Sequence, residues 1–438
     1  MSLPRYPEYK ASGVEWLGEV PGHWDVVPFY SVAKEREESN IGMLEDNLLS
    51  LSYGRIVQKD ITSNDGLLPE SFETYQIVRP GDMVFRLTDL QNDKRSLRTA
   101  IVEETGIITS AYVAAKPISV EPLYLNHLLR SYDTQKVFYS MGGGLRQSMK
   151  FSDLKRLPTL VPPPEEQQTI AAFLDRETGK IDALIAEQRR LVELLAEKRQ
   201  AVISHAVTKG LNPNAKMKDS GIEWLGEVPV HWYRAQVGRV CNQISDGPHF
   251  SPNYVDDGVM FLSARNIGVD SWHLDDAKFI SEADYSEFCR RVIPEKGDVL
   301  YTKGGTTGIA RVVDIEDRFQ VWVHVAVLKL DQGLIDPYYL AYALNSVGCY
   351  EQSQLHTRGA TNQDLGLTRM TKIWFALPPL EEQFEISEFL DRETAEFDTL
   401  TAEANRAITL LQERRSALIS AAVTGKIDVR SVQVMELA

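Results

Sequence analysis

Residues 165–208 read EEQQTIAAFLDRETGKIDALIAEQRRLVELLAEKRQAVISHAVT, and residues 381–424 repeat them as EEQFEISEFLDRETAEFDTLTAEANRAITLLQERRSALISAAVT. The copies are identical at 25 of 44 positions and start 216 residues apart. Neither contains proline, both open on paired glutamates that favour a helix N-terminus, and a glycine follows each, at 210 and 425. Each copy therefore predicts one helix of roughly 65 Å.

Apolar residues step by three and four along both copies, as a heptad seam requires. The seam positions are Ile170, Leu174, Ile181, Leu184, Leu191, Leu195 and Val202 in the first copy, and Ile386, Leu390, Phe397, Leu400, Ala407, Leu411 and Leu418 in the second. A seam this long needs a partner, and the twin helix supplies one. We expect the two helices to pair antiparallel around a pseudo-twofold axis.

A second duplication precedes each helix. Residues 12–24 read SGVEWLGEVPGHW and residues 220–232 read SGIEWLGEVPVHW, identical at 11 of 13 positions. The segments that follow, 25–164 and 233–380, differ in length by only eight residues but are far less alike. The repeated flanks and dissimilar interiors indicate one duplicated scaffold that holds two different recognition segments.

Both unlike segments have mixed α/β character. The pairs Gly81-Asp82 and Gly297-Asp298 predict the same turn before the same strand, and Pro122 and Pro337 each predict the start of a helix. The expected strands are 82–85, 100–102 and 107–115 in the first segment, and 298–301, 309–313 and 320–330 in the second.

The bulk composition is that of a globular protein, with 43% hydrophobic and 25% charged residues in 438. No apolar run predicts a membrane span, and the N-terminus lacks an apolar signal core, so we expect a cytoplasmic location. The three cysteines show no pairing or zinc pattern. A formal charge of −15 argues against a simple nucleic-acid binder, so any DNA binding should be local and assisted by a more positive partner.

Polar loops follow similar elements in both segments: 88–98 and 142–147 in the first, 303–308 and 357–363 in the second. Arginine, lysine, asparagine and glutamine are the side chains that read base edges. The candidate DNA-binding residues are Arg86, Thr88, Gln91, Asn92, Lys94, Arg95, Arg98, Arg146, Gln147, Lys150, Lys303, Thr306, Thr307, Arg358, Asn362 and Gln363. For any one of them, a solvated loop without a ligand is the alternative.

Catalytic signatures are lacking in the sequence. Asp336-Pro-Tyr-Tyr339 resembles the catalytic motif of amino-DNA methyltransferases, but its second proline is missing, and a helix N-cap explains it better. The loop 303–308 is not a nucleotide-binding loop, and the histidines form no metal motif. We therefore expect a chain that is not an enzyme, with no catalytic residues, cofactor or metal of its own.

The whole chain resembles the specificity subunit of type I restriction–modification systems. The resemblance is carried by the duplicated SGxEWLGEVPxHW motif and the duplicated EEQ…FLDRET…AVT helices. The Gly81-Asp82 segment with residues 86–95, and the Gly297-Asp298 segment with residues 301–305, are similar to that family's recognition domains.

The resemblance implies two globular α/β target recognition domains joined by a pair of long antiparallel coiled-coil helices. The expected boundaries are 1–160 for the first domain with its N-terminal arm, 161–212 for the first helix, 213–376 for the second domain, and 377–438 for the second helix and tail. Each domain would read one half of a gapped sequence in double-stranded DNA, and the helices would set the gap.

The resemblance also implies the partners. Two methyltransferase subunits would dock on the chain and supply S-adenosylmethionine, and restriction subunits with translocase activity would complete the complex. Two alternatives stay open at this point: a structural coiled-coil adaptor whose end domains bind proteins, and a self-contained DNA methyltransferase.

Overall fold

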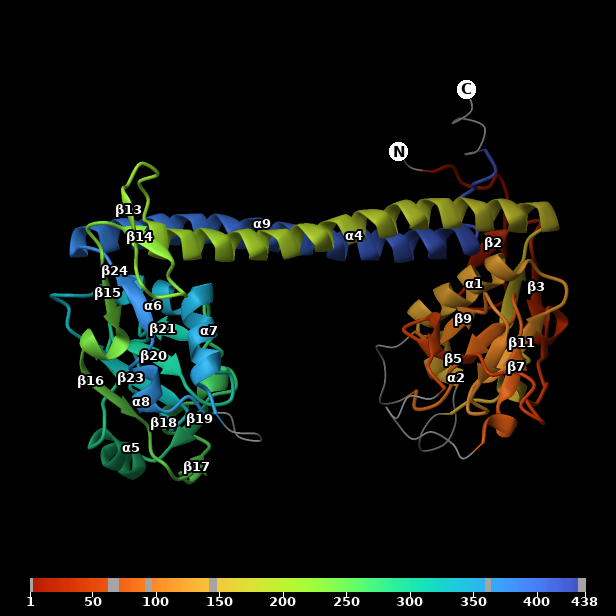
Figure 1. Cartoon of the computed structure of the whole chain (residues 1–438). Coiled ribbons are helices and arrows are strands. Elements are labelled where there is room, and N and C mark those ends of the chain that lie inside the picture. The colour runs from red at the N-terminus through yellow and green to blue at the C-terminus, as the bar shows by residue number, and fades with distance from the viewer. Residues whose placement is uncertain (1–2, 62–70, 91–96, 142–147, 359–363, 432–438) are drawn as a thin grey trace. The chain divides into compact units, whose positions relative to one another are not determined.

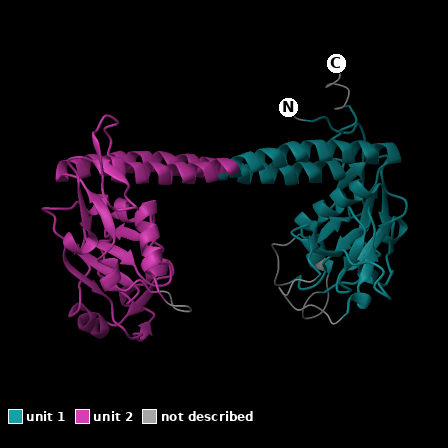
Figure 2. Cartoon of the chain, in the orientation of Figure 1, with its two compact units in different colours: residues 1–189, 405–438 teal, residues 190–404 magenta. Residues whose placement is uncertain are grey.

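The computed structural model describes residues 3–61, 71–90, 97–141, 148–358 and 364–431. The chain divides into two compact units, residues 1–189 with 405–438, and residues 190–404 (Figure 2). Two long helices, α4 (Pro164–Lys209) and α9 (Leu380–Val423), are each shared by both units (Figure 1). The two long predicted helices are therefore confirmed to within a residue or two at each end.

Unit 1 contains two four-stranded sheets. The first has the order β4-β11-β8-β9 and the second β6-β5-β10-β7. The strands of the first are β4 (Ala33–Glu35), β11 (Val113–Pro117), β8 (Met83–Phe85) and β9 (Thr99–Ile101), and those of the second are β6 (Arg55–Lys59), β5 (Leu48–Ser52), β10 (Gly106–Ile108) and β7 (Gln76–Val78). The helices are α1 (Pro122–Thr134), α2 (Val137–Met141) and α3 (Phe151–Leu154).

Unit 2 repeats this plan with the sheet orders β16-β23-β20-β21 and β17-β19-β18-β22. The strands of the first are β16 (Cys241–Asp246), β23 (Val325–Leu330), β20 (Val299–Thr302) and β21 (Ala310–Val312), and those of the second are β17 (Tyr254–Val255), β19 (Lys278–Ile280), β18 (Val259–Leu262) and β22 (Phe319–Val321). The helices are α5 (Glu282–Cys289), α6 (Pro337–Leu344), α7 (Val347–His356) and α8 (Leu367–Met370).

Two-stranded ribbons join each domain to its helices. In unit 1, β3 (Asp25–Pro28) pairs antiparallel with β12 (Pro158–Val161), and in unit 2, β15 (Tyr233–Gln236) pairs with β24 (Trp374–Leu377). The duplicated motif contributes a hairpin to each unit, β1 (Tyr9–Ala11) with β2 (Glu19–Pro21), and β13 (Met217–Asp219) with β14 (Glu227–Pro229). Both ends of each variable segment therefore return to the same ribbon.

Two of the expected strands are wrong in their length. Residues 107–115 form β10 and β11, and residues 320–330 form β22 and β23. In both units the chain leaves one sheet between these strands and enters the other, through turns closed by the hydrogen bonds Tyr112 N to Thr109 O and Val325 N to Trp322 O. Neither run contains proline or glycine, the residues that most strongly mark a break, so the sequence does not reveal the crossing.

Alternate residues of the central strands explain the layers. In β20, Val299 and Tyr301 pack towards the helices, while Leu300 packs against the second sheet. In β8, Met83 and Phe85 face the helix layer and Val84 faces the second sheet. Because side chains alternate along a strand, a strand between two apolar layers must be apolar throughout.

The long helices pair antiparallel within each unit. In unit 1, the guanidinium of Arg415 in α9 donates to both carboxylate oxygens of Asp182 in α4, at 2.9 and 3.1 Å. In unit 2, the equivalent pair is Arg199 and Asp398 at 3.8 Å, and Arg199 also binds Asp270 of the recognition domain.

The predicted seam is wrong at three positions, since Leu184, Leu191 and Leu400 are 52, 41 and 40% exposed. The buried seam passes instead through Thr178 and Ile185 in α4, and through Thr394 and Ala404 in α9. Each threonine hydroxyl donates to the carbonyl four residues earlier, at 2.6 and 2.7 Å, which satisfies the buried hydroxyl. A seam predicted from apolar residues alone misses the two threonines, and it chooses Leu184 where the adjacent Ile185 is buried.

In each unit the tryptophan motif contacts the start of one long helix and the end of the other. Trp24 is fully buried and donates its indole N–H to Glu166 at the start of α4, at 3.0 Å. The other edge of the indole lies beside Gly425 at the end of α9, where an added Cβ would be 3.4 Å away. We call this set the Trp–Glu clamp.

Unit 2 has an equivalent clamp, in which Trp232 donates to Glu382 at 2.7 Å and packs beside Gly210, where an added Cβ would be 3.1 Å away. His23 and His231 contact the same carboxylates at 2.8 and 3.0 Å. Both glycines have positive φ, +72° and +75°, as a helix C-terminus favours.

The glutamine that follows each clamp glutamate fixes the domain helix. Gln167 accepts from the backbone N–H of Glu121, and Gln383 from that of Asp336, both at 2.8 Å. Asp336 in turn caps α6 by accepting from Tyr339 N at 2.8 Å. The Asp-Pro motif is thus a helix N-cap, as expected, and Pro122 and Pro337 open α1 and α6.

Replacing Glu166 with alanine should lower the thermal stability of the chain. The change leaves the buried indole N–H of Trp24 and the hydroxyl of Tyr6 without their acceptor, at a cost of about 1–3 kcal/mol. Glu165→Ala is the matched control, because Glu165 is exposed on the same helical turn. Equal melting temperatures for the two variants would contradict the clamp.

Candidate nucleic-acid interface

The strand that leads to the predicted loops starts at the same turn in both units. Gly81 and Gly297 both have φ of +88°, and the following aspartates are buried. Asp82 accepts from Arg79 N at 2.9 Å and from Arg36 at 2.8 and 3.0 Å. This turn fixes the direction of β8, so the loop after β8 leaves from a rigid base.

The turn before β20 has the same construction. Asp298 accepts from Glu295 N at 2.8 Å and from Lys329 Nζ at 2.9 Å. Burial raises the pKa of Asp298, and the bonds from Lys329 and Glu295 N partly oppose that rise. The predicted equivalence of the two Gly-Asp turns is therefore confirmed.

The structure brings described residues at the ends of the two predicted loops together in each unit. In unit 1, Met149 N donates to Leu87 O at 2.9 Å, which joins the segment after 142–147 to the start of loop 88–98. In unit 2, Leu365 N donates to Lys303 O at 2.7 Å, which joins loop 357–363 to loop 303–308. Both contacts occupy equivalent positions, 216 residues apart along the sequence.

Several predicted residues lie at the surface near these junctions. Arg86 and Thr88 are half-buried after β8, Lys150 is exposed before α3, and Thr306 and Arg358 are exposed in unit 2. Eight predicted residues lie outside the described residues: Gln91, Asn92, Lys94, Arg95, Arg146, Gln147, Asn362 and Gln363.

The predicted role of Arg98 as a DNA-binding residue is wrong, because its side chain is fully buried. Its guanidinium donates to the carbonyls of Thr88 and Asp89, at 3.0 and 3.4 Å, and to the hydroxyl of Tyr139 at 3.3 Å. Arg86 N donates to Arg98 O at 2.9 Å and closes the loop. Arg98 therefore stabilises the loop from inside and is not available to a base edge.

The predicted role of Lys303 in DNA binding is also wrong, since the residue is only 4% exposed. Its ammonium lies 3.2 Å from Asp246 and 3.3 Å from Asp364. Burial raises the pKa of Asp246, but the hydrogen bond from Arg291 and the charge of Lys303 outweigh it and hold the pKa below its usual range. Lys303 therefore ties loop 303–308 to β16 and to the segment after 359–363.

Thr307 is also buried, at 4% exposed, and its carbonyl accepts from Gln354 at 3.2 Å. It supports the loop rather than presenting a side chain.

Glycine lets loop 303–308 pass close to its neighbours. A Cβ on Gly304 would lie 2.1 Å from His324 Nδ1, and Gly308 has φ of +95°. A larger residue at either position would force the loop or the neighbouring side chains to shift.

Loop 303–308 borders a hollow of about 360 Å³ in unit 2. Aromatic and cationic side chains surround it, and its lining is Tyr254, Phe261, Ser263, Ala264, Arg265, Lys278, Gly304, Gly305, Thr306, Trp322 and His324. Arg265 and Lys278 are exposed, and neither forms an ion pair within the described part of the chain. Sequence reasoning missed both, because they lie 25 to 40 residues before the glycine loop and no motif links them to it.

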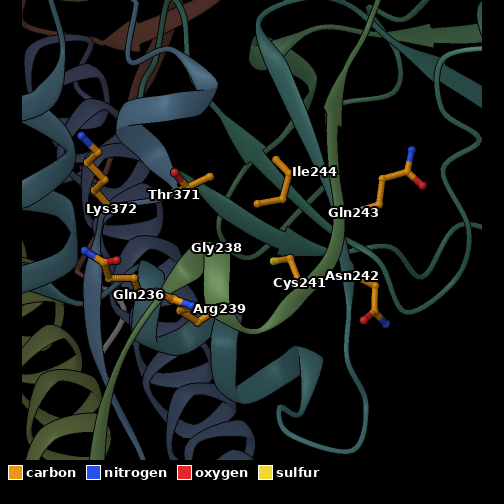
Figure 3. A pocket seen from close by; sticks show the side chains of 9 residues that line it. All are labelled: Gln236, Gly238, Arg239, Cys241, Asn242, Gln243, Ile244, Thr371 and Lys372. Atoms are coloured by element: carbon orange, nitrogen blue, oxygen red, sulfur yellow. The ribbon is translucent and has the colours of Figure 1, made fainter.

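A second hollow in unit 2, of about 530 Å³, contains none of the predicted residues that the structure describes. Figure 3 shows its lining: Gln236, Gly238, Arg239, Cys241, Asn242, Gln243, Ile244, Thr371 and Lys372. In unit 1, Tyr30 stands where unit 2 has Gly238, since Tyr30 N and Gly238 N make equivalent bonds to Lys155 O and Thr371 O. Burial raises the pKa of the Cys241 thiol to about 12, so this cysteine is not a nucleophile near neutral pH.

No group of three or more metal-binding side chains occurs within the described ranges. None of the helices in those ranges is long and apolar enough to cross a membrane.

Comparisons with known proteins fit this architecture. Residues 257–410 match the family model of the type I restriction modification DNA specificity domain. A putative specificity subunit of the type I restriction enzyme MjaX from Methanocaldococcus jannaschii is 22% identical, covering 95% of this chain and 96% of its own. The EcoKI specificity subunit of Escherichia coli is also 22% identical, with 94 and 91% covered.

The fold has solved counterparts. A chain from a solved type I restriction–modification system superposes with a TM-score of 0.62 at 19% identity, covering 92% of this chain and 98% of that one. Residues 257–410 therefore match a specificity domain of the type I class. Over nearly its whole length the chain is similar to specificity subunits of type I restriction–modification systems, which are the non-catalytic components of those systems.

Replacing Lys303 with methionine should lower the melting temperature, because it removes a positive charge from buried Asp246. The pKa of Asp246 is lowered in the folded chain, so this stabilisation is present above its unfolded value of about 4 and is lost as pH falls through the folded value. The difference from wild type should therefore be largest near neutral pH and should shrink in acid. Thr306→Ala, an exposed change in the same loop, should not alter the melting temperature.

Proposed function

We propose that this chain is the DNA-reading subunit of its complex, and that each recognition domain reads one half of a bipartite, gapped sequence in double-stranded DNA. The observation that carries the proposal is the matched junction in the two units, Leu87 with Met149 and Lys303 with Leu365. One framework joins the described ends of two loops in each domain, and the sequences of those loops differ. Such a chain presents two different reading surfaces.

The proposed contacts are the surface and loop residues that remain after the corrections. They are Arg86, Thr88, Gln91, Asn92, Lys94, Arg95, Arg146, Gln147 and Lys150 in the first domain, and Thr306, Arg358, Asn362 and Gln363 in the second. Arginine and the amides make paired hydrogen bonds to guanine and adenine edges, which gives each half-site its sequence.

The long helices would hold two methyltransferase subunits. Leu184 and Leu400 occupy equivalent positions in α4 and α9 and are 52 and 40% exposed, and Leu194 and Leu410 are an equivalent pair at 44 and 54%. Single exposed leucines are common on protein surfaces, but these recur at equivalent positions of both long helices, and we place the partner there. Because each occurs twice, two copies of one partner fit better than a single one.

The net charge supports the same assembly. A chain with a formal charge of −15 lacks the positive field that DNA binding needs, so the methyltransferase subunits would supply the remaining positive surface around the duplex. Restriction subunits with translocase activity would join that core, in the cytoplasm where the DNA is.

Methylation mapping tests this proposal. The chain is co-expressed with its methyltransferase subunits, and the modified positions of host DNA are read by single-molecule sequencing. We expect one asymmetric sequence with a gap, methylated on adenine in each half. Methylation without sequence preference would overturn the reading role and favour a structural adaptor.

Lengthening both helices tests their role in spacing. A seven-residue insertion after Leu191 in α4 and after Ala407 in α9 adds one heptad to each and keeps the seam in register. It should lengthen the gap by about three base pairs, since seven residues add about 10 Å and one base pair spans 3.4 Å. Both half-sites should stay the same, and a change in their bases instead would contradict the spacing role.

A further inference from the structure

A tight turn in unit 1 carries an exposed tyrosine in an unfavourable backbone conformation. The strands β5 and β6 pair up to Ser52 and Arg55, so Tyr53 and Gly54 form a two-residue hairpin turn. Both have positive φ, +46° and +76°. Asparagine or aspartate is the usual first residue of such a turn, because a bulky side chain is disfavoured there.

Packing does not explain the tyrosine. Tyr53 is 76% exposed, and its side chain makes no hydrogen bond or ring contact with the residues that the structure describes. A strained conformation without a packing gain indicates a functional position rather than a stabilising one.

Arg130 fixes the turn next to the predicted loop. Its Nη2 donates to Gly54 O at 2.5 Å and to Thr99 O at 2.9 Å, and Thr99 directly follows loop 88–98. A Cβ on Gly54 would lie 1.8 Å from Arg130 Nη1, so only glycine allows this contact. The turn is therefore held rigidly beside the end of that loop.

Unit 2 places the corresponding connection beside its own loop. The strand β18 runs parallel to β22 as β5 does to β10, and β19 corresponds to β6. The connection from β18 to β19 is longer and carries Ser263, Ala264 and Arg265, which line the 360 Å³ hollow with Gly304, Gly305 and Thr306. In unit 1 this connection is linked through Arg130 to the strand that follows the loop, and in unit 2 it lines a hollow with the loop itself, although its length and sequence differ.

We propose that this connection is a base-reading element in both recognition domains, with Tyr53 contacting base edges in the first half-site and Arg265 in the second. The proposal rests on the proposed function. A tyrosine offers a ring to a thymine methyl group and a hydroxyl to a base edge, and an arginine offers paired donors to guanine.

The test uses the intact complex with its methyltransferase subunits and duplexes that carry the mapped target or one base change in either half. Tyr53→Asn relieves the backbone strain of the positive-φ turn position, so the melting temperature should stay the same or rise. Discrimination against the changed base should fall about 5- to 150-fold in one half-site only. Arg265→Ala should do the same in the other half-site only.

Tyr233→Asn is the matched control, because Tyr233 is 74% exposed on the ribbon strand β15 and should leave discrimination unchanged. Unchanged discrimination in Tyr53→Asn would overturn the inference while leaving the proposed function intact. A uniform loss of affinity for every duplex would overturn it too, since that marks a backbone contact, and so would a lower melting temperature. A wild-type complex without sequence preference would overturn the proposed function, and the inference with it.

Discussion

In each unit, the hydrogen bond between a buried tryptophan and the second glutamate of a long helix holds the domain and the two helices together. Trp24 joins the start of α4 to the end of α9, and Trp232 joins the start of α9 to the end of α4. The strands β3 and β15 follow directly after these tryptophans, so the clamp also fixes where each domain attaches. A buried N–H without an acceptor is costly, which ties the two duplicated motifs to each other.

The attachment explains how the two domains differ while the frame stays the same. Each variable segment begins and ends on one antiparallel ribbon, β3 with β12 or β15 with β24. The layers inside the domain depend on apolar side chains of β8 and β20 that point alternately into the two layers. Loops at the strand ends can therefore change without disturbing the clamp or the helix pair.

The sequence predicted the repeated elements well and the loop chemistry less well. Helix positions, the Gly-Asp turns and the helix caps follow from local patterns that a chain carries in itself. The seam was wrong at Leu184, where the adjacent Ile185 is buried instead, and it missed Thr178, a buried polar residue whose hydroxyl bonds to Leu174 O. Arg98 and Lys303 looked like DNA contacts, but their charges are used inside the domains. Whether a loop cation faces solvent depends on acceptors contributed by distant segments.

The sequence by itself determined the duplication, the two long helices and the resemblance to type I specificity subunits, because these rest on repeated motifs and their spacing. Only the tertiary structure decided which loops meet, since the bonds between Leu87 and Met149 and between Lys303 and Leu365 join segments about 60 residues apart. It also brought the turn at Tyr53 beside loop 88–98 through Arg130, a contact across three separate segments. Folding selects such contacts through burial and hydrogen bonding, and local sequence does not encode them.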